Sequence, residues 1–169
     1  MAIVILATDT NATYLPGAGE STVIPDGVIR ASNNAEAVEI GSLGVTLTVD
    51  GTIYGGSDGV DVEASNVRIT IGANGSIHAV NSNVSTAISV PVSFATGLTV
   101  TNLGTVTGVQ SLDGDATTGT TLANHGIMSG SASGVSVGAN SRITNTGLIE
   151  GLNAFAIWSP GNNVELVNH

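Results

Sequence analysis

The sequence contains no cysteine and no lysine, and aromatic residues make up only 3% of its 169 residues. Without cysteine, the chain can form neither a disulfide framework nor a thiolate zinc site. Its three arginines, Arg30, Arg68 and Arg142, stand against 13 acidic residues, and the net charge is -10. So few cations cannot displace the counterions of a nucleic acid, and they give no attraction to an anionic membrane surface. We therefore exclude nucleic acid as a partner.

Long apolar runs are also missing. The apolar segment 2–7 is too short to span a bilayer, and no basic residue precedes it. It is neither a transmembrane helix nor a secretory signal peptide, so we expect no membrane insertion. We interpret residues 1–20 as an N-terminal cap and residues 21–169 as one repetitive domain.

Glycine is abundant, with 23 residues, and it marks a repeat. Segments 98–108, 120–130 and 141–151 align without gaps on the pattern φ-x-N-x-G-x-φ-x-G, where φ is apolar. The same alignment extends along the chain and places one glycine in each repeat: Gly27, Gly51, Gly75, Gly104, Gly126 and Gly147. These glycines lie 24, 24, 29, 22 and 21 residues apart. A repeat of this period is typical of solenoids, with one coil per interval.

Apolar residues at spacings of two flank each glycine, which indicates strands with one buried face. Four residues before the glycines we expect inward side chains at Val23, Leu47, Ile71, Val100, Leu122 and Ile143, and two residues after them at Ile29, Ile53, Ile77, Val106, Met128 and Ile149. A further strand follows in most coils, with Val38, Val60, Ile88, Val135 and Phe155 as core residues.

These patterns predict an all-β fold, a parallel β-solenoid of about seven coils with two or three short strands each. The connection rule for parallel strands favours right-handed winding. At the usual strand spacing the rod would be on the order of 30 Å long. We interpret the irregular stretches 89–94 and 111–121 as loops, the first as a flap that leaves the rod.

One column of the repeat carries asparagine. Two residues before the glycine stand Asn102, Asn124, Asn145 and Asn168, whereas the first three coils carry Pro25, Val49 and Ala73. Like side chains stack in register in such coils, so we expect an internal ladder in which each amide donates to the next. A structural role is favoured over ligand binding, because buried amides at bends satisfy the backbone there.

The N-x-G-x-φ-x-G phrase resembles the coils of bacterial secreted β-helical proteins, including autotransporter passenger domains and haemolysin-type (RTX) calcium-binding proteins. The resemblance covers most of residues 21–169 and rests on Asn102, Gly104, Gly108, Asn124, Gly126, Gly130, Asn145, Gly147 and Gly151. It implies an extracellular or cell-surface protein, exported without a cleaved N-terminal signal peptide. Residues 167–169 repeat residues 123–125, after which the chain enters a bend at Gly126. We therefore expect the solenoid to be truncated at its C-terminal end and to self-associate through that open end.

Aligned strands place acidic residues side by side, with Glu36 over Asp58 and Glu39 over Asp61, and with Glu63 following. Like charges at this spacing repel. Either solvent and salt screen them, or calcium bridges them through hard oxygen ligands. Asp113 and Asp115 form a second candidate calcium site.

An outward column of Arg30, Tyr54, His78, Thr107, Ser129 and Glu150 brings aromatic and titratable groups together. Tyr54 and His78 could contact a sugar ring, and Trp158 is a further candidate glycan contact. The alternatives are a mixed solvated face for the column and corner packing for Trp158.

From these features we expect a non-catalytic extracellular β-helix segment of a larger secreted or surface protein, serving as stalk, scaffold or adhesive surface for a cell-surface glycan. The alternatives are a carbohydrate-active enzyme similar to polysaccharide lyases or epimerases, and the passenger region of a toxin. Lyase chemistry needs cations that neutralise a sugar carboxylate. Arg30 and Arg142 lie about five coils apart, on the order of 20 Å, which argues against a shared site.

Overall fold

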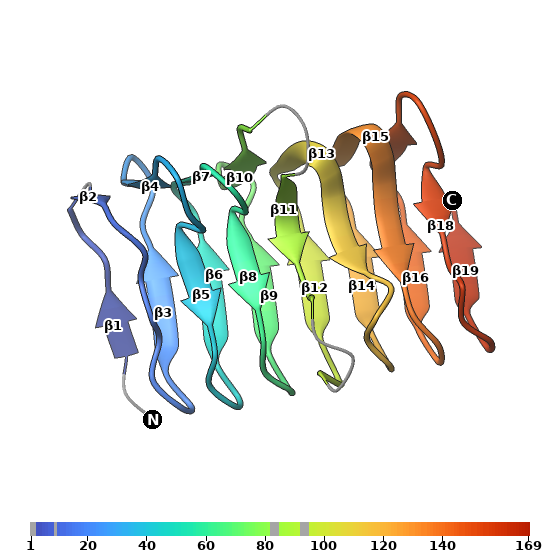
Figure 1. The fold of residues 1–169 in the computed structure, drawn as a ribbon, viewed down its shortest axis with the longest axis horizontal. Helices are drawn as coiled ribbons and strands as arrows, with labels where there is room; N and C mark the ends of the chain where they lie inside the picture. The colour runs from blue at the N-terminus through green and yellow to red at the C-terminus, as the bar shows by residue number, and fades with distance from the viewer. Residues whose placement is uncertain (1–2, 9, 82–84, 92–94) are drawn as a thin grey trace.

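The computed structural model describes residues 3–8, 10–81, 85–91 and 95–169. Within these ranges the chain is all-β and winds as a parallel β-solenoid, and every strand pair is parallel. Successive coils follow one another along the rod (Figure 1). The predicted fold class is confirmed.

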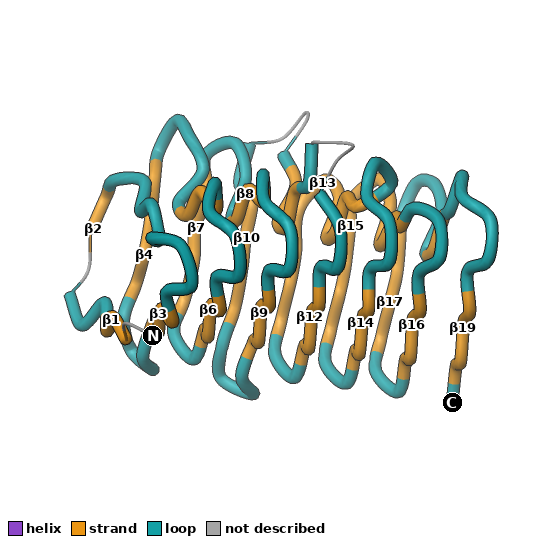
Figure 2. Tube along the Cα trace, turned by 90° about the horizontal axis from the view of Figure 1, so that it is seen from below, coloured by secondary structure: helices purple, strands orange, loops and turns teal. Residues whose placement is uncertain are grey.

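Each complete coil has three strand positions. The first forms an eight-stranded sheet in the order β1 (Ile3–Ile5), β3 (Ser21–Ile24), β6 (Thr46–Val49), β9 (Arg68–Ile71), β12 (Thr99–Asn102), β14 (Thr121–Asn124), β16 (Arg142–Asn145) and β19 (Glu165–Asn168). Seven strand spacings separate its two edges, a length of about 34 Å. Corresponding strands repeat along the rod in the view from below (Figure 2).

The second and third positions share one sheet. The second position holds β2 (Thr10–Asn11), β4 (Ile29–Ser32), β7 (Thr52–Gly55), β10 (Ser76–Ala79) and β17 (Leu148–Gly151), and the third holds β5 (Val38–Ile40), β8 (Val60–Val62), β11 (Thr86–Ser89) and β18 (Ile157–Trp158). In two coils a single long strand covers both positions, namely β13 (Thr105–Gly114) and β15 (Ile127–Val137). The segment predicted as a cap pairs in the same way, through β1 with β3 and β2 with β4.

Columns of aliphatic side chains fill the interior. Registered strands stack Leu47, Ile69, Val100, Leu122 and Ile143 in one column, Ile53, Ile77, Val106 and Met128 in a second, and Val38, Val60, Ile88, Leu112 and Val135 in a third. All of them are buried. Such columns of medium-sized aliphatic side chains explain how a chain with 3% aromatics forms a continuous core.

The predicted register is wrong in the first coil. Its bend between Ile24 and Ile29 contains four residues, whereas the bend between Val49 and Thr52 contains two. Ile24 rather than Pro25 therefore stacks on Val49, and Arg30 rather than Ile29 occupies the core column. Since neighbouring residues of a strand face opposite sides, this shift turns the Arg30 side chain inward and the Ile29 side chain outward.

The third coil has the same long bend, between Ile71 and Ser76. Ile69, not Ile71, consequently stacks on Leu47, and Ile71, not Ala73, precedes the asparagine column. This shift is by two residues, so Ile71 still faces inward, whereas Ala73 is exposed in the bend.

Two further predictions are corrected and one lies outside the described residues. Residues 111–114 belong to β13 and not to a loop, and Leu112 is a core residue in register with Ile88 and Val135. Phe155 is 59% exposed, because Ile157 takes the position beside Val135. Residues 92–94 of the expected flap are not among the described residues.

Candidate functional site

The four asparagines of the repeat form a ladder inside the rod. Each side-chain amide donates to the next side-chain carbonyl, from Asn102 to Asn124 at 2.8 Å, from Asn124 to Asn145 at 2.7 Å and from Asn145 to Asn168 at 2.7 Å. The first three side chains are buried. The ladder therefore lies within the core, on the inner face of the first sheet.

The ladder also satisfies the bends that follow each strand. Asn102 Oδ1 accepts from the backbone N–H of Gly104 at 3.1 Å, and its Nδ2 donates to the carbonyl of Ile127 at 3.1 Å. Asn124 Nδ2 likewise donates to the carbonyl of Leu148 at 3.0 Å. These side-chain amides thus link neighbouring coils and satisfy backbone groups of the bends, so their donors and acceptors are used for structure.

On the outer face, Tyr54 and His78 form a stacked pair. Their ring centroids lie 5.0 Å apart with an interplanar angle of 20°. His78 Nδ1 lies 2.6 Å from Thr107 Oγ1, and this hydrogen bond holds the imidazole in place. Burial lowers the pKa of His78, so the ring is neutral at pH 7.

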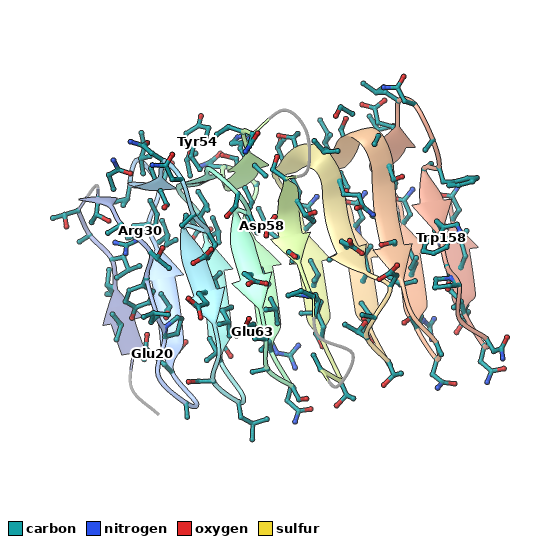
Figure 3. The ribbon with its side chains drawn as sticks, in the orientation of Figure 1. Glu20, Arg30, Tyr54, Asp58, Glu63 and Trp158 are labelled. Carbon is teal, nitrogen blue, oxygen red and sulfur yellow. The ribbon has the colours of Figure 1, made fainter. Side chains whose placement is uncertain are left out.

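Trp158 does not join this pair. It lies on β18 beside Ser136, in the last complete coil, and is 39% exposed. Tyr54 and Trp158 are placed toward opposite ends of the rod (Figure 3). The three residues predicted as glycan contacts are therefore two separate groups.

The acidic residues share one outer face around the third strand position. Glu39 is in register with Asp61, and Asp58 and Glu63 flank β8 (Figure 3). The backbone N–H of Ala37 donates to the carbonyl of Asp58 at 3.2 Å, so the preceding residue, Glu36, lies beside Asp58. We call Glu36, Glu39, Asp58, Asp61 and Glu63 the acidic face.

Asp61 is the most perturbed group of the acidic face. Burial, together with the neighbouring charges of Asp58, Glu63, Glu36 and Glu39, raises its pKa to about 7. Its buried Oδ1 has no hydrogen-bond partner among the described residues. Burial also raises the pKa of Asp58, whose Oδ1 accepts from the backbone N–H of Thr86 at 2.8 Å. Asp58 and Asp61 therefore hold protons more tightly than isolated carboxylates do.

The second acidic pair lies further along the same outer column, where Ser89 separates Asp61 from Asp113. Asp113 Oδ1 accepts from Ser136 Oγ at 2.8 Å. Burial, followed by the charge of Asp113, raises the pKa of Asp115.

The predicted calcium ligands are Glu36, Glu39, Asp58, Asp61, Asp113 and Asp115, and Ser89 separates the first four from the last two along the rod. Among the described residues, no three acidic or histidine side chains are arranged to hold a metal ion. Glu39 and Asp61 lie on neighbouring strands, and Glu36 and Asp58 precede those strands.

Because the pKa of Asp61 is raised, we expect the rod to become less stable as pH rises. Its pKa is about 7 when folded and near 3.8 when unfolded, so the folded state binds the extra proton between these values. The free energy of unfolding should be highest below pH 4, fall between pH 4 and 7 and level off above pH 7. The total decrease is about 1–2 kcal/mol after solvent screening. Urea unfolding at a series of pH values measures this.

Replacement of Asp61 by Asn should flatten that pH profile, because the amide needs no proton. Asp26→Asn is the matched control, since it removes one charge from an exposed turn outside the acidic face. If the stability of Asp61→Asn depends on pH as steeply as that of the unchanged chain, Asp61 is not the group responsible for the pH dependence.

The three arginines do not converge. Arg142 pairs with Glu165 at 3.5 Å on the outer face of the first sheet, and Arg68 is exposed on the same sheet three strands away. Arg30, only 7% exposed, points into the other end of the core.

Arg30 belongs to a polar cluster that the repeat pattern did not reveal. It donates to Thr10 Oγ1, and its guanidinium lies 5.3 Å from the ring centre of Tyr14. The Tyr14 hydroxyl donates to Glu20, which also accepts from Thr22 Oγ1 at 2.7 Å. The sequence signal that could have found it is the turn sequence Pro25-Asp26-Gly27 before Arg30, and Gly27 has a positive φ in the structure.

Arg30→Met should leave the free energy of unfolding unchanged or raise it by up to about 2 kcal/mol. Among the described residues the buried Nε of Arg30 has no hydrogen-bond partner, and replacing a buried charge by an apolar side chain is often neutral or stabilising. Met128 already fills the same column in another coil. Chemical denaturation checks this, with exposed Arg142→Met as control, and a loss above about 1 kcal/mol would show that the Tyr14 contact dominates.

Within the described residues, no helix has the length and apolarity needed to cross a membrane. Comparison with protein-family models, with curated proteins and with solved structures finds no match to this chain.

Proposed function

We propose that this chain is a non-catalytic β-solenoid segment of a secreted or cell-surface protein, serving as stalk, scaffold or adhesive surface. The observation that supports it most is the continuity of the rod. The strands of the first sheet stay in register from β1 to β19, and the asparagine ladder links the last four coils inside the rod. Such a rod holds whatever it carries at a set distance and orientation.

The outer surface supports an adhesive form of this function. Polar side chains repeat on neighbouring strands at about 4.8 Å, for example Thr48, Thr70 and Thr101 on the first sheet. The Tyr54–His78 pair interrupts the polar surface of the second position with an aromatic group. Regular polar surfaces with a few aromatic anchors suit the hydroxyl-rich surface of a glycan.

Localisation can be tested in the organism that encodes the chain. Antibodies raised against residues 1–169 should label intact cells or the spent medium. Labelling seen only after permeabilisation would overturn the surface role.

A carbohydrate-active enzyme is the second candidate, and the raised pKa of Asp61 favours it, because acid–base catalysts have such values. The arginine geometry opposes it, since no two of the three arginines face the acidic residues together. We expect no unsaturated, ultraviolet-absorbing product from pectate or alginate, with or without calcium. Product that is lost in Asp61→Asn would establish the enzyme instead.

A further inference from the structure

One outer column carries a small side chain beside its aromatic pair. Asn11, Ala31, Tyr54 and His78 occupy the same outward position in four consecutive coils. Ala31 has only a methyl group, whereas its neighbours on both sides have larger side chains. The strands of Asn11 and Tyr54 are about 9.6 Å apart, and between them only the methyl group of Ala31 stands at this outward position. We call this position, between Asn11 and Tyr54, the Ala31 step.

The Tyr54 ring forms one wall of the step. His78 stacks on the side of that ring away from Ala31, so the other face of the ring is directed toward the step. Tyr54 is 39% exposed. Because Thr107 holds His78 by hydrogen bonding, the aromatic wall is already ordered before any ligand binds.

Neutral amides provide polar groups around the step. Asn11 lies on its far side, and exposed Asn33 and Asn34 follow Ala31 after one buried residue. Amides offer both donors and acceptors, as sugar hydroxyls require. The arginine of this strand points into the core, so no cation from β4 faces outward there.

We propose that the Ala31 step binds an uncharged pyranose ring of a glycan, with the apolar face of the sugar stacked on Tyr54 and its hydroxyls bound by the neighbouring amides. This inference rests on the adhesive form of the proposed function. The neutral state of His78 and the net charge of -10 disfavour an acidic sugar at this position.

The test uses the full chain on an array of immobilised oligosaccharides that end in glucose, galactose, mannose or N-acetylglucosamine. The same oligosaccharides ending in sialic or uronic acid serve for comparison. We expect binding to at least one neutral oligosaccharide and weaker binding to its acidic counterpart. Titration calorimetry with the best neutral oligosaccharide then measures the affinity of each variant.

Two variants change the step in opposite ways. Tyr54→Ala removes the wall, and Ala31→Tyr fills the step with a ring that can stack on Tyr54, so this variant keeps or raises the thermal midpoint. Both should weaken binding at least tenfold. Ala123→Tyr is the matched control, because it makes the same exchange at an outward position of the first sheet, and its affinity should be unchanged.

The proposal is overturned if no neutral oligosaccharide binds, if the acidic forms bind better, or if binding survives Ala31→Tyr. These outcomes leave the stalk function intact, because that function is judged separately by cell-surface labelling. Conversely, if the protein is found only inside cells, the stalk function is overturned, but the glycan affinity measured at the Ala31 step is unaffected.

Discussion

Replacement of Asn124 by Ala is expected to lower the free energy of unfolding by about 3 kcal/mol. The Asn124 amide donates to Asn145 at 2.7 Å and to the carbonyl of Leu148 at 3.0 Å, and it accepts from Asn102 at 2.8 Å. Its removal leaves buried groups on both sides without partners, at about 1–3 kcal/mol for each unsatisfied group. Urea unfolding followed by circular dichroism measures the loss.

Two companions make this experiment specific to the ladder. Asn162→Ala removes an exposed asparagine at a bend and should change the stability by less than about 0.5 kcal/mol. Asn124→Asp keeps the shape but loses the donors to Asn145 and Leu148, so it should also destabilise strongly. An unchanged midpoint for Asn124→Ala would show that this side chain does not form the ladder in solution.

Replacement of Gly126 by Ala should cost about 3 kcal/mol or more. An added Cβ would press against the carbonyl oxygen of Gly104 and lie 2.8 Å from the carbonyl carbon of Leu103. Both are backbone atoms of the preceding coil, so the two coils would have to move apart and their hydrogen bonds would weaken. The thermal midpoint should fall by more than 5 °C.

Gly41→Ala is the matched control for this steric argument. A Cβ at Gly41 meets no atom within 4 Å, and the backbone there does not have a positive φ. We expect a change between zero and a gain of about 1 kcal/mol, because alanine restricts the unfolded chain. Equal losses in Gly126→Ala and Gly41→Ala would mean that contact between coils is not what excludes a side chain at Gly126.

The sequence by itself determined the architecture. A repeat of 21 to 29 residues with apolar positions spaced by two predicts stacked parallel strands, and the asparagine column predicts the inner ladder. The register of Glu39 with Asp61 was also predictable, because the two strands share the same small-φ-x-φ pattern. These features depend on local alternation, which the sequence displays directly.

The tertiary structure alone decided which way side chains face where bends differ in length. The backbone N–H groups of Asp50 and Gly51 both donate to the carbonyl of Ile24, and this pairing sets the register of the first bend. Arg30 turns inward as a result, and Ala31 takes the outward place beside Tyr54. A glycine alignment cannot reveal this, because the two extra residues of the first bend lie one before and one after Gly27, and a shift of one residue against the glycine reverses the face of every side chain in the adjoining strand.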